Sequence, residues 1–413
     1  MTGRIPSTKM AIAVCGAGIG GLASALLLAR QGHAVTLFER FETPQPVGSG
    51  FMLQPTGMAV LDALGLAGAV AERGAWVDRI FGRSEPSGAV ILDVSYAALD
   101  PDYRGLGVQR TALFDLLFEA VKREAVTLRP GMIVTGASRG TLTFADYAPT
   151  GPFDLIVDAL GSGSALSDRY PARALPYGAL WATLDWPDSG PFSPHALEQR
   201  YERASRMAGV LPVGSADAGA PAKATFFWSL PHGGLDDWRA KPLDAWKDDV
   251  RALWPDTAIL LDGIDRHDAL AWATYRHRTL SRPHGDGIVH IGDSYHATSP
   301  QLGQGANMAL LDAYALARAV ECEGKAEIGA TYAQLRQGHV RLFQTMSRLF
   351  TPVYQSDSRA LPILRDRIVG PLSRRWPAPP MLAALVSGTM GWPLARLGLD
   401  AYRVGKGKPV ARS

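Results

Sequence analysis

A glycine-rich turn near the N-terminus constrains the fold of this chain more than any other feature. The apolar run MAIAVC (residues 10–15) is typical of a buried parallel strand, and GAGIGG follows it with Gly16, Gly18 and Gly21 in G-x-G-x-x-G spacing. A helical stretch and the strand AVTLFE complete a βαβ unit. In such a unit the first glycine forms the tight turn, the second lets the backbone approach a pyrophosphate, and the third lets the helix pack on the strand. The pattern therefore predicts a Rossmann-like dinucleotide site.

A second segment decides which dinucleotide fits. Glu39 ends the second strand, where a carboxylate can accept a hydrogen bond from an adenosine ribose, but this feature is shared by NAD and FAD sites. Far along the chain, GDSYHATSPQLGQGANM (residues 292–308) places Asp293 after another strand, before a proline-containing loop and a helix N-terminus. Only an extended FAD needs this segment, because its ribityl chain and isoalloxazine run away from the first βαβ unit. We therefore predict FAD.

Composition excludes several other classes. The chain has 413 residues, enough for two sub-domains, and its formal net charge of +3 gives no case for nucleic acid binding. Its two cysteines, Cys15 and Cys322, have no metal-ligand spacing, so we expect no metal site and a reducing, cytoplasmic location. Prolines and glycines within residues 376–395 disfavour a membrane-spanning helix, so no stable membrane insertion is expected. That stretch either packs as a C-terminal segment or contacts a membrane or an apolar partner.

The rest of the chain predicts an α/β fold with an inserted sheet. Short β-like runs separated by turn signals predict a β-sheet substrate domain within a Rossmann-like FAD-binding domain, followed by a C-terminal helical segment. The expected boundaries are 1–73, 104–170 and 279–345 for the FAD-binding domain, 74–103 and 171–278 for the substrate domain, and 346–413 for the C-terminal helical segment and tail.

Three motifs carry a resemblance to a known family. GAGIGG with Glu39-Arg40, GVQRTALFDLL around Arg110, and GDSYHATSPQLGQGANMALLDA resemble, in this order, the FAD-binding elements of the class A flavoprotein monooxygenases, the para-hydroxybenzoate hydroxylase-like family. The resemblance implies reduction of FAD by NADH or NADPH. It also implies insertion of one oxygen atom from O2 into an aromatic or apolar small molecule through a C4a-hydroperoxyflavin. The cofactor-binding residues that it implies are Gly16, Gly18, Ile19, Gly21, Glu39, Arg40, Arg110, Asp293, Gly303, Gln304, Gly305, Ala306 and Asn307.

The same resemblance gives some of these residues a role. It implies that Glu39 and Arg40 lie near the adenosine, and that Asp293 binds the ribityl or pyrophosphate region. It further implies that Pro300 borders the flavin ring, and that the loop GSGFML (residues 48–53) lies beside both ring and substrate.

Catalytic and substrate-binding side chains are less well defined. No nucleophile, base and metal constellation stands out, which fits a cofactor that carries the chemistry itself. The flavin-adjacent candidates are Pro300 and His296, the histidine acting either as a proton relay or, as we favour, by fixing the loop. Substrate-contact candidates in the predicted insert are Tyr177, Trp181 and Trp228, together with Arg200, Tyr201 and Phe227. Such aromatic residues are also common in protein cores.

One departure from the family concerns the electron donor. Family members carry an Asp-Gly pair after the third nucleotide-domain strand, whereas DLIVDALGSGS places Leu160 before Gly161 here. A leucine cannot accept hydrogen bonds, and Asp158, two residues earlier, is a candidate substitute. The alternatives are a variant that still uses NAD(P)H, a flavin oxidase or dehydrogenase that does not, and a flavin-binding protein without catalysis. The oligomeric state is not indicated by the sequence.

Overall fold

The first layer of the molecule is a parallel sheet at the N-terminal βαβ unit. The computed structural model describes residues 9–45, 49–167, 170–217 and 219–405. The strands of this sheet, in spatial order, are β19 (His284–Gly285), β20 (Ile288–His290), β11 (Leu155–Asp158), β1 (Ala11–Cys15), β2 (Ala34–Phe38) and β8 (Val126–Arg129). All are parallel except β19, as expected for strands joined by helical crossovers. The carboxyl ends of β1, β2 and β11 therefore lie at one edge, where ligands bind in open α/β sheets.

Helices and a hairpin cover the two faces of this sheet. Helices α1 (Ile19–Arg30), α4 (Arg110–Lys122) and α9 (Gly305–Cys322) share one apolar core with the sheet. The hairpin of β9 (Val134–Ser138) and β10 (Thr141–Phe144) covers the other face through a separate apolar cluster. The central strands β1 and β11 are buried on both faces, which explains why their sequences are almost continuously apolar rather than alternating.

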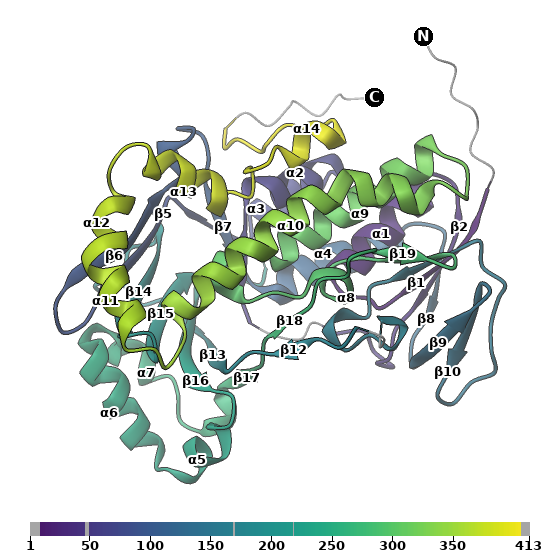
Figure 1. Ribbon diagram of the computed structural model, residues 1–413. Coiled ribbons are helices and arrows are strands. Elements are labelled where there is room, and N and C mark those ends of the chain that lie inside the picture. Colours follow the sequence, from purple (N-terminus) through teal and green to yellow (C-terminus); the bar gives the residue numbers. More distant parts are fainter. Residues whose placement is uncertain (1–8, 46–48, 168–169, 218, 406–413) are drawn as a thin grey trace.

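A second, mostly antiparallel sheet forms the other half of the molecule (Figure 1). Its strands, in spatial order, are β17 (Ala271–Ala273), β13 (Tyr177–Asp185), β16 (Lys223–Pro231), β15 (Arg206–Pro212), β14 (Ala196–Glu202), β5 (Arg79–Ser84) and β6 (Ala89–Ser95). One face packs on α6 (Leu243–Leu253) and α7 (Ala258–Leu261), with α5 (Leu235–Ala240) beside them, through a tryptophan-rich core. The other face is turned toward the nucleotide domain.

Shorter elements join the two halves. A three-stranded sheet of β3 (Phe51–Leu53), β7 (Gly105–Val108) and β4 (Ala75–Val77) lies between them, and a two-stranded sheet pairs β12 (Arg173–Ala174) with β18 (Arg276–His277). Helices α2 (Pro55–Ala63) and α3 (Ala67–Ala71) follow β3, and α8 (Asp293–His296) follows β20.

The C-terminal part of the chain is helical and spans both halves. The long helix α10 (Ile328–Tyr354) runs from the nucleotide domain to the second sheet, as Figure 1 shows. It is followed by α11 (Ala360–Leu364), a π-helical turn (Arg365–Val369), α12 (Gly370–Ser373), α13 (Ala378–Val386) and α14 (Pro393–Leu397). No helix in the described ranges is long and apolar enough to cross a membrane. The predicted fold class, a Rossmann-like domain with an inserted sheet and a C-terminal helical segment, is confirmed.

Candidate active site

Two cavities meet between the two sheets. The nucleotide cavity, of about 440 Å³, follows the carboxyl edge of the parallel sheet and the N-terminus of α1. The sheet cavity, of about 320 Å³, lies against the second sheet and the C-terminal helices. Four residues line both cavities: Arg110, Asp293, Gly305 and Ala306. The two cavities therefore form one elongated site, which suits an extended dinucleotide better than a compact ligand.

The three glycines of the first motif serve different physical purposes. Gly16 has φ +102°, and a Cβ there would lie 2.6 Å from the carbonyl oxygen of Ala159. A Cβ on Gly21 would lie 1.9 Å from the carbonyl oxygen of Gly16, so helix and strand could not pack as closely. Gly18, the N-cap of α1, has φ −71°, and a Cβ there would meet no atom within 4 Å. The open space at Gly18 lies at the helix N-terminus, where a pyrophosphate is stabilised by free N–H groups.

Glu39 fixes the turn at the other side of the nucleotide cavity. One carboxylate oxygen accepts a hydrogen bond from the backbone N–H of Ala17 (2.8 Å), and the other accepts one from Phe41 (3.1 Å). Glu39 and Arg40 both line the nucleotide cavity. The carboxylate is therefore held at the cavity wall, where it can also accept from a ribose hydroxyl.

A buried charge pair stands where the two cavities meet. The guanidinium of Arg110 lies 5.1 Å from the ring centroid of Phe51, burial lowers its pKa, and its Nε has no hydrogen-bond partner among the described residues. Burial also disfavours the charged form of Asp293 and so raises the pKa of its carboxyl group, although the charges of His296 and Arg110 oppose this shift. A buried guanidinium at a cavity wall, with an Nε that has no hydrogen-bond partner in the described part of the chain, suits an anionic ligand. A diphosphate supplies one, so these residues fit an FAD.

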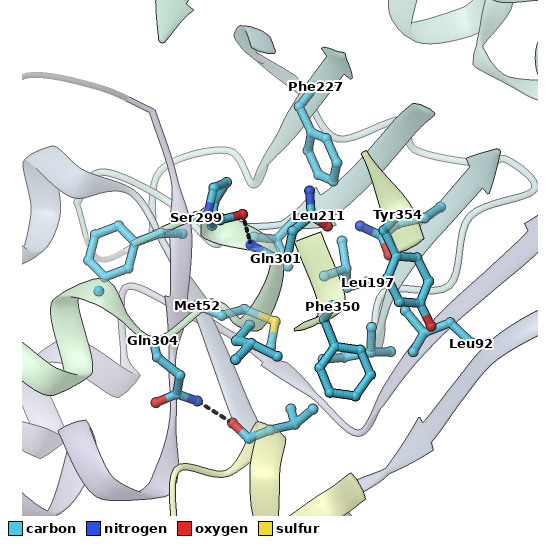
Figure 2. Close-up of a pocket in the computed structure, with 18 of the residues that line it drawn as sticks. Met52, Leu92, Leu197, Leu211, Phe227, Ser299, Gln301, Gln304, Phe350 and Tyr354 are labelled. Carbon is cyan, nitrogen blue, oxygen red and sulfur yellow. Dashed lines mark hydrogen bonds between the residues drawn. The ribbon is translucent and has the colours of Figure 1, made fainter. Parts of the chain in front are cut away.

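The loop before α9 is held in place by side-chain hydrogen bonds (Figure 2). Gln304 donates from Nε2 to the carbonyl oxygen of Val386 (2.6 Å), and Ser299 accepts from the backbone N–H of Gln301 (3.4 Å). Gly303, which follows the loop's short helical turn (Pro300–Leu302), has φ +60°, a conformation that favours glycine. Pro300, Gly303 and Gln304 all line the sheet cavity.

Asn307, predicted to bind the cofactor, lies in the first turn of α9 as expected, but its side chain is used within the protein. It lines neither cavity, because it is fully buried against β3 and α2. Its Oδ1 accepts from the backbone N–H of Gln54 (2.8 Å), and its Nδ2 donates to the carbonyl oxygens of Met52 (3.1 Å) and Gly303 (3.0 Å). Asn307 therefore ties the GSGFML loop to the start of α9. Gly50, Phe51 and Met52 of that loop line the sheet cavity, while Gly48 lies outside the described residues.

His296 belongs to a buried ionic network beneath the site. Its Nε2 lies 2.6 Å from Oδ2 of Asp312, which also accepts from the backbone N–H of Gly292 (2.8 Å). The other oxygen of Asp312 accepts from Nε of Arg336 (2.7 Å). Burial opposes ionisation of Asp312, but the charges of His296 and Arg336 outweigh it and lower the pKa to about 2. Because His296 lines neither cavity, the geometry favours fixing of the Gly292–Asp293 turn over proton relay.

The sheet cavity receives some of the expected aromatic side chains and not others. Trp181 and Phe227 line it, as does Tyr201, because they lie on the face of the second sheet turned toward the nucleotide domain. Trp228, the next residue after Phe227, points to the opposite face and packs in the core beneath α6 and α7. Tyr177 is buried with its hydroxyl hydrogen-bonded to Asp357, and neither it nor Arg200 lines the cavity. In this structure neither Tyr177 nor Trp228 faces the cavity, and both side chains have partners within the protein.

Most of the remaining wall is apolar and comes from elements that the sequence did not associate with the site. Figure 2 shows Phe350 and Tyr354 of α10 beside Leu92, with Leu197 and Leu211 of the sheet nearby. Among polar groups of the wall, Trp181 Nε1 donates to the hydroxyl of Tyr275 (2.8 Å), Tyr201 donates to Gln199 (3.0 Å) and Gln301 to Gln355 (3.2 Å). These polar groups already have partners. Of the described lining residues, only Arg110 carries a positive charge.

Leu160 lines the nucleotide cavity, and Asp158 does not replace the missing carboxylate. Asp158 is fully buried and accepts hydrogen bonds from Ser164 Oγ (2.7 Å) and the backbone N–H of Leu160 (3.1 Å), and its Oδ2 lies 2.7 Å from Nδ1 of His290. Its two oxygens are committed to the turn after β11 and to β20. This edge of the nucleotide cavity therefore offers an apolar side chain.

Comparison with known proteins agrees with this geometry. Residues 9–130 and 200–343 match the family model described as FAD binding domain. The chain is 31% identical to the 6-methylpretetramide 4-monooxygenase of Streptomyces rimosus, over 76% of this chain and 75% of that protein. It is 25% identical to the 6-hydroxynicotinate 3-monooxygenase of Pseudomonas fluorescens, over 77% of this chain and 83% of that protein.

Solved structures share the fold. A Klebsiella pneumoniae HpxO structure complexed with FAD and uric acid superposes with a TM-score of 0.75 at 22% identity, covering 92% of this chain and 98% of that chain. A structure of Pseudomonas aeruginosa PqsL with 2-aminobenzoylacetate gives a TM-score of 0.74 at 20% identity, covering 87% and 100%.

Proposed function

Because the chain belongs to the class A FAD-dependent monooxygenases, the para-hydroxybenzoate hydroxylase-like family, we propose that it hydroxylates a neutral, fused-ring aromatic substrate bound in the sheet cavity. The family fixes the reaction: one oxygen atom of O2 enters an aromatic ring, and NADH or NADPH supplies the electrons. Most of these relatives are named monooxygenases or hydroxylases, so a flavin oxidase or dehydrogenase on the same scaffold is not favoured. The substrate class is our proposal.

The composition of the cavity wall carries this proposal. A carboxylated substrate would need a cation in the wall, and Arg110, the one described cation there, lies at the junction with the nucleotide cavity beside Asp293. Most of the remaining wall is apolar, with side chains such as Leu197, Leu211 and Phe227 that suit a flat apolar molecule. Among the relatives, the enzyme named for 6-methylpretetramide and the Rhodococcus erythropolis protein named probable 2-heptyl-3-hydroxy-4(1H)-quinolone synthase support a substrate of this class.

The residues described above give FAD its binding site. We propose that Gly16, Gly18, Ile19 and Gly21 hold the pyrophosphate, Glu39 and Arg40 the adenosine, and Arg110 and Asp293 the centre of the cofactor. The loop from Pro300 to Ala306 would border the ring, where the N-terminus of α9 favours negative charge. When bound there, FAD would supply the redox chemistry between the nicotinamide and O2. The protein supplies binding, orientation and exclusion of water.

Asp293 is held at the junction of the two cavities in this arrangement. Burial raises the pKa of its carboxyl group, and the charges of His296 and Arg110 oppose that shift. The network of His296, Asp312 and Arg336 holds the turn that presents it.

The domain boundaries follow from the same proposal. We assign residues 1–73, 104–170 and 279–345 to the FAD-binding domain, and 74–103 and 171–278 to the substrate domain. The strands of the second sheet all fall within the latter two ranges, which supports the division. A cytoplasmic location is proposed from the free thiols of Cys15 and Cys322.

A substrate panel tests the proposal. Purified holoprotein is mixed with NADH or NADPH and with neutral two- and three-ring phenols or with hydroxybenzoates, and nicotinamide oxidation is followed. We expect fused-ring phenols to stimulate oxidation more than hydroxybenzoates do. Equal or greater stimulation by hydroxybenzoates contradicts the proposed substrate class.

Two tryptophans of the same sheet give a matched pair of variants. Trp181→Phe removes the Nε1–H that donates to Tyr275 in the cavity wall, so we expect it to raise the KM for the stimulating phenol. Trp228→Phe makes the same chemical change on the opposite face, so we expect it to leave that KM unchanged. An equal KM change in both variants would place the substrate elsewhere.

A further inference from the structure

The C-terminal segment exposes a group of large apolar side chains. α11, the π-helical turn and α12 form one continuous helix over residues 360–373, and α13 follows after a short turn. The exposed large apolar residues on this segment are Ile363, Leu364, Ile368, Val369, Leu372, Trp376 and Met381. Leu364, Ile368 and Leu372 are spaced four residues apart, which places them on one side of the helix. Trp376 is 86% exposed and Leu372 55%, so the neighbouring elements of the protein do not cover them.

The same segment carries positive charge that is not in ion pairs with any described residue. Arg359, Arg367, Arg374 and Arg375 are exposed, and none of them forms an ion pair with a carboxylate in the part of the chain that the structure describes. Between residues 359 and 381 the single acid is Asp366, and its two oxygens already accept from Ser84 Oγ (2.6 Å) and Arg365 Nε (2.7 Å). We call this surface of exposed apolar and arginine side chains the basic–apolar face. Its partner must combine negative charge with an apolar interior or surface.

The basic–apolar face borders the sheet cavity. Val369 and Ser373, on the same continuous helix, line that cavity, and Leu382 and Leu385 of α13 form part of its wall. Val369 is also 36% exposed, so this cavity-lining side chain lies on the same exposed segment as Ile368 and Leu372. Figure 1 shows α11, α12 and α13 beside β5 and β6 on the side of the molecule away from the parallel sheet. The apolar surface outside and the apolar cavity inside are therefore separated by a single helix.

We propose that the basic–apolar face docks on an anionic lipid bilayer. The four arginines would contact the phosphate groups of the lipids, while Trp376, Leu372 and Ile368 would enter the interfacial region. A helix that exposes apolar side chains between arginines, with a tryptophan at its end, has the composition of an interfacial membrane helix. The docking is peripheral, since no described helix is long and apolar enough to cross a membrane. An apolar substrate could then enter the sheet cavity from the lipid beside Val369, an idea that rests on the proposed function. The docking of this face on the bilayer does not depend on the proposed function.

Vesicle sedimentation tests the docking. The FAD-loaded full chain is centrifuged with vesicles of phosphatidylcholine alone or with added phosphatidylglycerol, and the bound fraction is measured. We expect binding to the anionic vesicles to be much tighter and to weaken as salt is raised. Arg374→Ala with Arg375→Ala should weaken it about 30-fold, since ~1 kcal/mol per basic residue near an anionic surface corresponds to about fivefold per arginine. Leu372→Ser should weaken binding to the anionic vesicles without changing its salt dependence.

Matched changes elsewhere on the surface serve as controls. Arg239→Ala with Lys241→Ala removes the same charge from the exposed end of α5, and Ile259→Ser removes an exposed apolar side chain from α7. Both controls should bind vesicles like the parent, and all variants should retain FAD at the parental ratio. Equal sedimentation with neutral and anionic vesicles, no sedimentation, or undiminished binding of the double arginine variant overturns the proposal. Those results would favour an acidic protein as the partner of this face.

Discussion

Substitution of Gly18 and Gly21 separates ligand binding from folding within a single motif. A Cβ on Gly18 enters open space in the nucleotide cavity, and its φ of −71° is accessible to any residue. Gly18→Val should therefore fold normally but fill the space that we assign to the pyrophosphate. Gly21→Ala places a methyl group 1.9 Å from the carbonyl oxygen of Gly16, so strand and helix must separate whether or not FAD is present.

The expected magnitudes follow from these contacts. For Gly18→Val, a reduced entropy of the unfolded chain, of about 0.4–1 kcal/mol, offsets the poor N-capping of valine, so the net change is below about 1 kcal/mol. With an unfolding entropy of ~2.1 cal/mol/K per residue, 1 kcal/mol moves the Tm of a chain of this length by about 1 °C. For Gly21→Ala, overpacking against the backbone should lower the free energy of unfolding by about 1–3 kcal/mol or more, which lowers the Tm by roughly 1–3 °C or more.

Two measurements on each variant check this reasoning. The FAD content is taken from the visible absorbance of the purified protein, and the Tm of each FAD-stripped protein is measured by differential scanning fluorimetry. We expect Gly18→Val to lose FAD with an unchanged Tm, and Gly21→Ala to lower the Tm of the stripped protein. A Gly18→Val protein with full FAD content would refute our assignment of the pyrophosphate site.

Three further substitutions test the site. Asp293→Asn should reduce FAD retention. Burial raises the pKa of Asp293, so in the FAD-stripped parent the stability that this carboxyl group contributes is lost as the pH rises above its ordinary pKa of 3.8. The Tm of the stripped variant should therefore rise relative to that of the stripped parent as the pH rises. Asp312→Asn leaves the buried Arg336 without its carboxylate partner, which should cost ~3–5 kcal/mol of stability and lower the Tm at pH 7 by about 3–5 °C. Because the pKa of Asp312 is lowered to about 2, the Tm difference should become smaller as the pH falls from 3.8 toward 2. Leu160→Asp should speed the anaerobic reduction of the flavin by NADH or NADPH, followed by stopped-flow absorbance, at unchanged FAD content. An unchanged rate would show that the residue at position 160 does not affect binding of the nicotinamide.

Local sequence could predict the parts of the site that lie on a strand, a turn and a helix that follow one another directly in the chain. The spacing of Gly16, Gly18 and Gly21 requires a strand before it and a helix after it, and Asp293 stands where a late strand ends. Both features depend on residues a few positions apart, so periodicity and glycine chemistry were sufficient to expect them.

The remaining parts depend on tertiary packing. Whether Trp181 or Trp228 faces the cavity is decided by the register of β13 against β16, and a shift of one residue would exchange the two faces. Phe350 and Leu385 reach the cavity because α10 and α13 fold back over the second sheet, a contact that no local pattern encodes. Asn307 belongs to a cofactor-binding motif, yet its side chain is used to join two chain segments. The buried pairing of Asp312 with Arg336 likewise joins residues 24 positions apart.

Oxygen labelling tests the central claim most directly. The FAD-loaded protein is incubated with NADH or NADPH, the best stimulating fused-ring phenol from the panel, and O2 labelled with oxygen-18, and the product is analysed by mass spectrometry. Our account predicts a hydroxylated product that carries one oxygen-18 atom. Oxidation of the nicotinamide with hydrogen peroxide as the only oxygen product, or a hydroxyl group that carries oxygen from water, would contradict it.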